Sequence, residues 1–310
     1  MPDDATQWLL APLLVVALTA FAGCSAVVHG RAHRPPASAA AVPGPTPTTP
    51  PPRSVAPPPA PRPHIEKPGP ATAARTLVGW LVRDLPRGSV SVAALDTVTG
   101  ASFAAGARGG IWTASVVKVD ILETLLLRAE DAGVGLSAEE QLAATLMIEH
   151  SDNERAEELF WAAGGRDGII AANARLGLGH TVVGPEDYWG LTTTSAADQI
   201  TLLRHLVTPG LLPASARRYV RGLMSNVAYD QRWGVSVAGD HGSPVITKDG
   251  WLSIVEDGDR WAVGSVGLVT VGGHLLLMAV LTQHNPSMED GVELVQRLAR
   301  LTATAVRDRR

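Results

Sequence analysis

The chain has 310 residues, of which 45% are hydrophobic and 18% charged, and its formal net charge at pH 7 is −4. Residues 1–23 hold two acidic residues and residues 24–74 hold five basic residues and one acidic residue, which leaves about −6 for residues 75–310. A globular part of that charge excludes nucleic acid as a main partner, because such binding depends on clustered Lys and Arg. The single cysteine excludes an internal disulfide and a multi-cysteine metal site.

The N-terminal segment has the pattern of a secretory signal. Residues 9–22 form an apolar run of fourteen, which is too short for a bilayer span of about 20 residues. The run ends in Phe21-Ala22-Gly23-Cys24, which resembles a bacterial lipobox. We expect residues 1–23 to be a signal peptide and Cys24 to carry a lipid, which places the protein at the outer face of the cytoplasmic membrane. An uncleaved anchor, a mis-assigned start and simple secretion are the alternatives.

Residues 24–74 are expected to form a tether. Fifteen of the chain's 23 prolines lie between Pro35 and Pro70. Proline fixes φ and has no N–H group, so the segment favours extended polyproline II at about 3.1 Å per residue. Such an arm could hold a domain on the order of 100 Å from a membrane. An SH3-type ligand is the alternative, but a spacer fits a segment outside the cell.

The length and hydrophobic periodicity of residues 75–310 predict one domain that contains both helices and strands. A helix ends near Arg83, a hairpin pairs 89–95 with 101–105, and a helical apolar stripe runs from Ser115 to Gly133. Further helices are expected at 138–148, 153–163, 166–176, 195–206 and 214–224, then strands at 244–252, 260–271 and 275–281, and a closing helix at 288–306. Strands from both ends of the domain would therefore form one sheet, with the helical middle as an inserted lobe.

The first candidate motif is Ser115-Val116-Val117-Lys118, at the predicted start of a helix. A spacing of three places Ser115 and Lys118 on one helix face, about a turn apart. The helix N-terminus offers free N–H groups to an anionic intermediate, and a partly desolvated lysine can have a lowered pKa and take the serine proton. Taken alone, the motif also fits a helix cap followed by a surface lysine.

Two further motifs lie downstream. Ser151-Asp152-Asn153 opens another predicted helix, where it also fits an ordinary cap. Lys248-Asp249-Gly250 lies in a predicted strand before Trp251, and its glycine permits a ligand to approach the backbone closely. An Asp-Gly turn after a surface lysine is the alternative for this motif.

In order, spacing and element type, the three motifs resemble the Ser-x-x-Lys, Ser-Asp-Asn and Lys-Thr-Gly set of class A β-lactamases and penicillin-binding proteins. The resemblance covers residues 75–310 and includes the stretch 190–194 before a predicted helix. It implies the α/β (α+β) fold of that family. A five-stranded antiparallel sheet would be flanked by helices and joined by an all-α lobe, with the site between sheet and lobe.

The resemblance also implies catalytic roles. Ser115 corresponds to the nucleophile that is acylated, and Lys118 to its base or proton relay. Ser151 would pass a proton to the leaving nitrogen. Lys248 would supply positive charge for Ser151 and for the substrate carboxylate.

Substrate binding is implied for four more residues. Asn153 would bind the side-chain amide of the substrate, and Asp249, Gly250 and Trp251 would line the substrate-binding strand. The backbone N–H groups of Ser115 and Trp251 would form the oxyanion hole.

The sequence departs from the family at two places. Asp249 stands where the family has Thr or Ser, and a carboxylate there would repel the substrate carboxylate unless Lys248 compensates. Residues 177–190 lack the Glu-x-x-Leu-Asn loop whose Glu drives deacylation in class A enzymes, and Glu186 and Asp187 do not align with it. We therefore expect the residues needed for acylation to be complete and deacylation to be slow.

Other site types are not supported. The chain has no Gly-x-Ser-x-Gly elbow and no phosphate loop, residues 75–310 hold no His-x-x-x-His pair, and His150 beside Ser151 is read as incidental. No metal and no cofactor are expected. The sequence thus predicts a lipid-anchored, monomeric serine hydrolase that acts on β-lactams or a peptidoglycan-derived amide. A penicillin-binding D-Ala-D-Ala peptidase and a catalytically silent envelope-binding protein of the same fold are the alternatives.

Overall fold

A computed structural model describes residues 69–307, so the predicted signal peptide, Cys24 and most of the predicted tether lie outside the described residues. The first helix, α1 (Pro70–Asp84), begins inside the stretch that was expected to be tether. The reason is that proline is tolerated in the first turn of a helix, where its missing N–H has no intrahelical partner in any case. None of the helices in residues 69–307 has the length and apolar character needed to cross a membrane.

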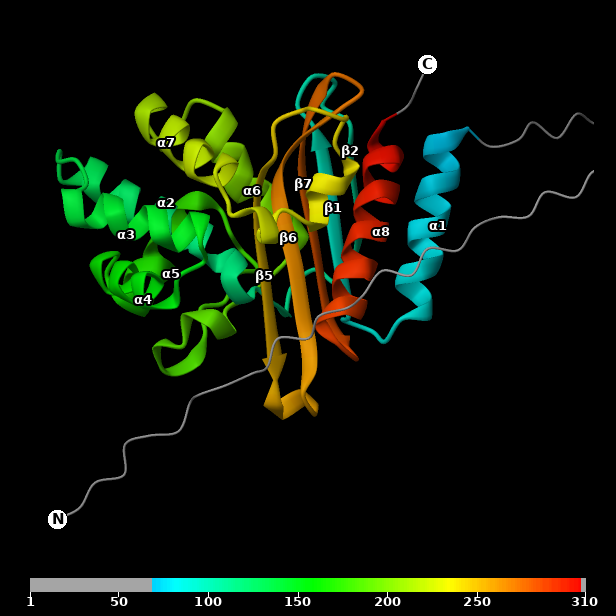
Figure 1. The fold of residues 1–310 in the computed structure, drawn as a ribbon, viewed down its shortest axis with the longest axis horizontal. Helices are drawn as coiled ribbons and strands as arrows, with labels where there is room; N and C mark the ends of the chain where they lie inside the picture. Colours follow the sequence, from blue (N-terminus) through cyan, green and yellow to red (C-terminus); the bar gives the residue numbers. More distant parts are fainter. Residues whose placement is uncertain (1–68, 308–310) are drawn as a thin grey trace, which may run out of the picture. The chain divides into compact units, whose positions relative to one another are not determined.

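A five-stranded sheet forms the centre of the domain (Figure 1), with strand order β2-β1-β7-β6-β5. All four neighbouring pairs are antiparallel. The strands are β1 (Val90–Asp96), β2 (Ser102–Gly106), β5 (Ile246–Ile254), β6 (Arg260–Val271) and β7 (His274–Asn285). The N-terminal hairpin pairs with the last strand, which confirms the prediction that one sheet is built from both ends of the domain.

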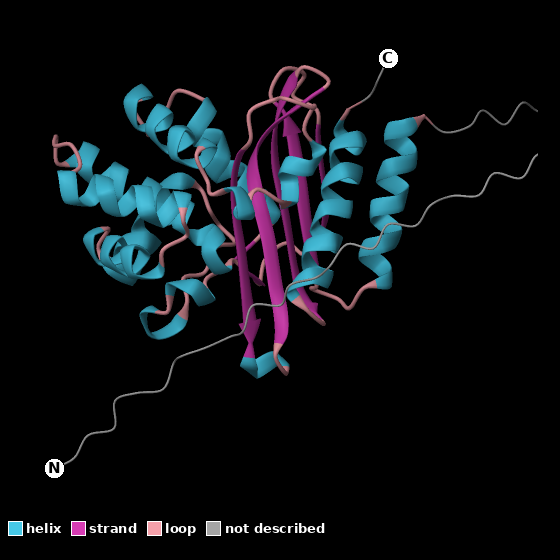
Figure 2. Ribbon diagram, in the orientation of Figure 1, coloured by secondary structure: helices cyan, strands magenta, loops and turns pink. Residues whose placement is uncertain are grey.

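Helices cover both faces of the sheet (Figure 2). On one face, α8 (Met288–Val306) packs on the sheet and α1 packs on α8. The other face carries the helical lobe: α2 (Lys118–Asp131), α3 (Ala138–Glu149), α4 (Asn153–Ala162), α5 (Gly165–Leu176), α6 (Ala196–Val207) and α7 (Ala214–Ser225). Each face has its own apolar core. The predicted helices that correspond to α3 through α8 are confirmed to within one residue, because their apolar periodicity reflects these two cores, whereas α2 begins three residues after the predicted start at Ser115.

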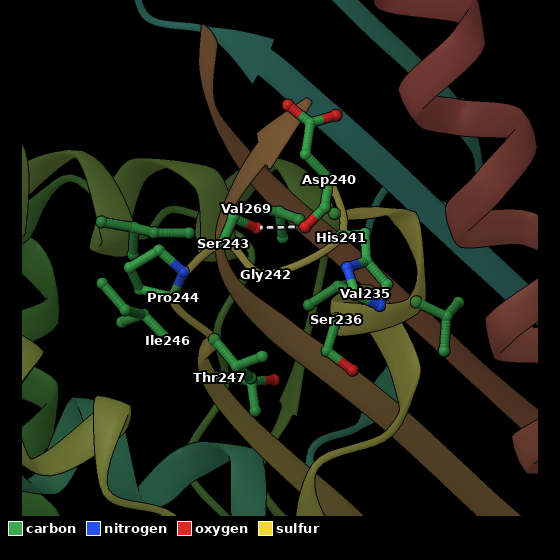
Figure 3. A pocket seen from close by; sticks show the side chains of 14 residues that line it. Val235, Ser236, Asp240, His241, Gly242, Ser243, Pro244, Ile246, Thr247 and Val269 are labelled. Carbon is green, nitrogen blue, oxygen red and sulfur yellow. Dashed lines mark hydrogen bonds between the residues drawn. The ribbon is translucent and has the colours of Figure 1, made fainter. Parts of the chain in front are cut away.

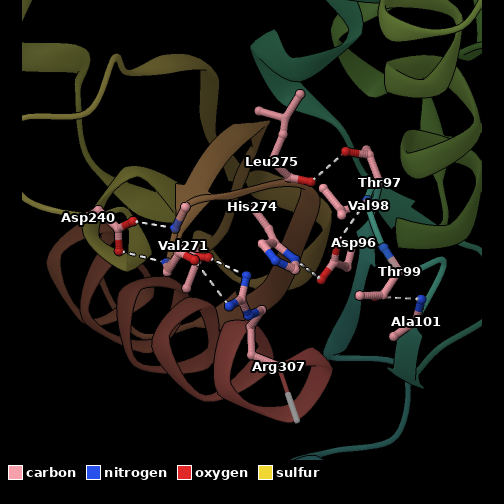
Figure 4. Close-up of polar contacts among 12 residues, drawn as sticks. Asp96, Thr97, Val98, Thr99, Ala101, Asp240, Val271, His274, Leu275 and Arg307 are labelled. Carbon is pink, nitrogen blue, oxygen red and sulfur yellow. Dashed lines mark hydrogen bonds and ion pairs between the residues drawn. The ribbon is translucent and has the colours of Figure 1, made fainter. Parts of the chain in front are cut away.

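Polar contacts join the turns at one end of the sheet (Figure 4). Asp96 accepts hydrogen bonds from the N–H groups of Val98 and Thr99, and its Oδ2 lies 2.8 Å from Nδ1 of His274, the first residue of β7. Burial alone would raise the pKa of Asp96, but the bond with His274 and the two N–H groups outweigh it and hold that pKa at about 2. The carboxylate therefore stays charged and ties the first hairpin to β7.

A second sheet of two short strands was not predicted. It pairs β3 (Ile111–Trp112) with β4 (Thr193–Thr194). Strands of two residues leave no periodicity to detect in a sequence. The pairing matters because it brings the segment before Ser115 against the segment that follows Trp189.

Candidate active site

Ser115 is held in a tight 3₁₀ turn, η1 (Ala114–Val117), rather than in the first turn of an α-helix as predicted. Ala114 has φ 45°, a strained value for a residue with a Cβ atom. Hydrogen bonds from Thr113 N and Oγ1 to the carbonyl of Thr192 and from Val116 N to the carbonyl of Thr113 hold the turn. The helix α2 then begins at Lys118. Strain of this kind persists only where the surroundings fix it, and here it presents the half-buried Ser115.

The strand β5 passes very close to this turn. A Cβ atom at Gly250 would lie 2.8 Å from the backbone nitrogen of Ser115 and 2.7 Å from that of Val116, distances that real Cβ atoms do not reach. Glycine is therefore required at position 250 for a steric reason, because only a residue without a side chain lets the strand approach Ser115.

We expect Gly250→Ala to lower the rate of acylation by at least about tenfold, because a displacement of about 1 Å at reacting groups is that costly. The added methyl group must push η1 and β5 apart. Gly179→Ala is the matched control, since Gly179 is exposed and a methyl group added there would meet no other part of the chain within 4 Å. Stopped-flow measurement of penicillin acylation on both variants tests this, and an unchanged rate in Gly250→Ala would contradict the packing described.

The amine of Lys118 is fully buried and makes three hydrogen bonds. Its Nζ donates to the carbonyl oxygen of Ser151 at 2.6 Å, to Ser151 Oγ at 3.2 Å and to Asn153 Oδ1 at 2.7 Å. Burial lowers the pKa of Lys118 to about 7, with help from the nearby charge of Lys248 and against the opposing effect of Asp152. A substantial fraction of this lysine is therefore neutral near pH 7.

Lys248 approaches the same serine from β5. It is fully buried, and its Nζ donates to Ser151 Oγ at 3.0 Å and to the carbonyl oxygen of Asp249 at 2.9 Å. Burial lowers the pKa of Lys248, and the Asp249 carboxyl opposes that shift. Ser151, whose φ of 56° is also in the left-handed region, thus holds its hydroxyl between two buried amines. The structure brings together Lys118, Ser151, Asn153 and Lys248.

Asp249 does not line this site, contrary to the sequence-based expectation. Its side chain is fully buried and accepts hydrogen bonds from Trp233 N at 3.2 Å and from Thr247 Oγ1 at 3.1 Å. Burial raises the pKa of this carboxyl. Consecutive residues of a strand point to opposite faces, so the orientation of Lys248 toward Ser151 directs Asp249 away from it. The alternation was a signal that could have corrected the expectation.

The structure also shows where the remaining predicted site residues lie. Asn153 is the exposed first residue of α4, directly after the cap residue Asp152. Trp251 is half-buried on β5, with its ring 5.9 Å from that of Trp233. Ser115 Oγ makes no hydrogen bond within residues 69–307, so the direct bond to Lys118 that the motif suggests is not formed here.

Two site residues were missed in the sequence: Trp189, which lies beside Lys118, and Glu157, which holds Trp189. The ring centroid of Trp189 lies 5.3 Å from Lys118 Nζ, and the indole N–H of Trp189 donates to Glu157 Oε2 at 2.8 Å. Glu157 follows Asn153 by four residues on α4, and that spacing was a usable signal because it places both on one helix face. Trp189 lies in the segment 177–190, where only carboxylates were expected to matter. Glu186 in that segment is exposed and makes no hydrogen bond to the described residues.

A separate cavity of about 240 Å³ lies near the start of β5 (Figure 3). Ser236, His241 and Thr247 are among the residues that line it, and none of Ser115, Lys118, Ser151 or Lys248 does. This cavity is therefore distinct from the candidate site.

Comparison with known proteins identifies similar chains. The family described as "Beta-lactamase enzyme family" matches residues 126–306, a range that includes the second and third motifs and begins after Lys118. The "Putative lipoprotein LppW" of Mycobacterium tuberculosis and that of Mycobacterium bovis are each 32% identical over 189 residues. That match covers 58% of this chain and 59% of the length of the mycobacterial proteins.

Solved structures share the fold. The structure of PBP-A is 21% identical with a TM-score of 0.64, and the match covers 76% of this chain and 96% of that one. A TLA-1 extended-spectrum beta-lactamase is 13% identical with a TM-score of 0.65 over 76% of this chain and 99% of its own. The mixed architecture, with a five-stranded antiparallel sheet and a helical lobe, is the one predicted.

Proposed function

The chain belongs to the beta-lactamase enzyme family, and from this premise we propose that it is an exported serine hydrolase, acylated on Ser115 by β-lactams or by a peptidoglycan-derived amide. The observation that carries the proposal is the position of Ser151 Oγ, 3.2 Å from Lys118 Nζ and 3.0 Å from Lys248 Nζ, both of them buried. A structural serine needs no such pair of desolvated amines.

Lys118 is the base in this proposal. An ammonium has three donors, and all three are used in the present arrangement. The neutral amine has two N–H groups and a lone pair, so one of the bonds must be given up when the proton leaves. The contact with Ser151 Oγ is the longest of the three, and the amine released from it takes the proton of Ser115 as that oxygen attacks the carbonyl carbon.

Ser151 carries the proton onward. Its oxygen accepts from Lys248, so its own hydrogen is available for the leaving nitrogen of the amide. That proton is replaced from Lys118, which took it from Ser115. Lys248 keeps its positive charge near the site and attracts the carboxylate that β-lactams and peptidoglycan peptides carry.

Three groups bind the substrate. The backbone N–H groups of Ser115 and Trp251 stabilise the developing oxyanion, and Gly250 allows the strand to come close enough for both to act. The exposed amide of Asn153 binds the substrate's side-chain amide. Asp249, being buried, does not repel the substrate carboxylate.

A penicillin-binding D-Ala-D-Ala peptidase is the second candidate function. It is favoured by the neighbour of Lys118, which is the ring of Trp189 rather than a loop carboxylate. Without a base beside the acyl-serine, the ester is long-lived, which is the behaviour of a penicillin-binding protein.

Intact-protein mass spectrometry of the wild-type chain tests the proposal. We expect a penicillin to add its full mass once, at a rate that increases with pH through about 7 as Lys118 becomes neutral. Failure to label with several β-lactams between about pH 6 and pH 9, across the pKa of Lys118, would favour the catalytically silent envelope-binding protein.

For the anchor, we propose that Cys24 is lipidated and holds a monomeric enzyme at the outer face of the cytoplasmic membrane. We expect Cys24→Ala to release the protein into the medium or to leave an unprocessed precursor, as measured by cell fractionation. Unchanged membrane association without a fatty acid on the mature protein would contradict the lipobox interpretation.

A further inference from the structure

One carboxylate at the rim of the candidate site binds two indole rings. Glu157 Oε1 accepts from Trp161 Nε1 at 2.6 Å, and Oε2 accepts from Trp189 Nε1 at 2.8 Å. Of the two rings, it is Trp189 that lies by the Lys118 amine, with 5.3 Å between Nζ and the ring centroid. Glu157 is therefore an indirect partner of Lys118 through the Trp189 ring.

Helix α4 supports Lys118 in two ways. Its first residue, Asn153, accepts a hydrogen bond from Nζ, and Glu157 one turn later holds the ring beside Nζ. Exposure falls along this path. Glu157 is exposed, Trp189 is half-buried, and Lys118 has no exposed surface at all. Because Lys118 Nζ lies over the face of the Trp189 ring, the ring covers one side of the amine.

The geometry points to Trp189 as a positioning residue that keeps water from the Lys118 amine, and to Glu157 as the residue that holds Trp189 in place. A ring face attracts an ammonium but solvates it less well than water does. Covering the amine therefore favours its neutral form, the form that accepts the proton of Ser115. The catalytic meaning of this arrangement rests on the proposed function, whereas the shielding itself does not.

The composition of the chain makes the shielding directly measurable. The sequence contains only three lysines, Lys67, Lys118 and Lys248, so its other basic residues are arginines. A chain labelled with ¹³C-lysine gives three side-chain Cε signals, and Lys118→Arg and Lys248→Arg assign two of them. Titration of the Lys118 signal by NMR reports its ionisation without any catalytic turnover.

The variants that test this inference replace Trp189 or Glu157. We expect Trp189→Leu to raise the titration midpoint of Lys118 from about 7 by at least about one pH unit toward the ordinary lysine value, because water reaches the amine. Trp189→Phe keeps a ring and should give a smaller rise. Glu157→Ala should also raise the midpoint, while Glu157→Gln, which retains one acceptor oxygen, should restore part of the wild-type value.

Trp161→Phe is the matched control. It removes an indole N–H from the same carboxylate but leaves the ring beside Lys118 in place, so the Lys118 midpoint should stay at the wild-type value. Glu157 and Trp161 are exposed, so variants of these two residues are expected to fold. They keep the inference testable if Trp189→Leu does not fold.

A Lys118 midpoint that is the same in wild type, Trp189→Leu and Glu157→Ala would overturn the inference, as would an equal rise in Trp161→Phe. The proposed function fails separately, through the absence of a penicillin adduct on the wild-type chain. A chain that never labels but whose Lys118 midpoint follows Trp189 would refute the function and support the shielding role.

Discussion

Ser115→Ala is expected to abolish the penicillin adduct completely. The covalent bond in the proposed mechanism joins the penicillin carbonyl carbon to Ser115 Oγ, and alanine has no atom that can form it. The buried amines of Lys118 and Lys248 remain in this variant, so non-covalent binding should survive while the mass increase disappears. Intact-protein mass spectrometry, followed by peptide mapping of the wild-type adduct, measures both the presence and the position of the label.

The matched control is Ser215→Ala, which removes an exposed serine on α7. It should label like the wild-type chain. Thermal unfolding of Ser115→Ala checks that the strained turn around Ala114 is retained. A full adduct on a correctly folded Ser115→Ala protein would place the nucleophile elsewhere and would refute the site assignment.

The second large effect concerns the fate of the acyl-serine. Hydrolysis of the ester requires a base that activates water, and losing one positioned base typically costs about 10²–10⁴-fold in rate. The segment 177–190 places the ring of Trp189, which cannot serve as a base, beside Lys118. We therefore expect a chromogenic cephalosporin to give a burst of about one equivalent followed by slow steady turnover.

Stopped-flow absorbance separates the two phases, and Glu186→Gln serves as the comparison variant. Glu186 is exposed and bonds to no described residue, so its loss should leave the slow phase nearly unchanged. Steady turnover above roughly 10 s⁻¹, a typical enzyme value, would show that a deacylating base operates. If that rate collapsed in Glu186→Gln with labelling of Ser115 intact, Glu186 would be that base.

Much of the architecture was predictable because local sequence patterns, such as apolar periodicity and turn residues, indicate it. Helix α2 shows its apolar stripe within its own residues, and the hairpin β1–β2 shows its turn at 96–100. These signals depend on neighbours along the chain, and each element buries the face that its periodicity marks. The order and spacing of three short motifs predicted one site, and the structure brings Ser151 and Lys248 of two motifs together with Lys118 of the first.

The sequence alone therefore predicted the long helices, the strands of the five-stranded sheet and the identity of the motif residues. Tertiary structure decided what surrounds them. The Asp249 side chain proved to be buried on the face of β5 opposite to that of Lys248, and the 3₁₀ turn with its strained Ala114 replaced an ordinary helix start. Trp189 meets Glu157 across 32 residues, and Lys248 meets Ser151 across 97. Contacts of this kind depend on how separate elements pack, and no local periodicity records which loop side chain will cover a buried amine.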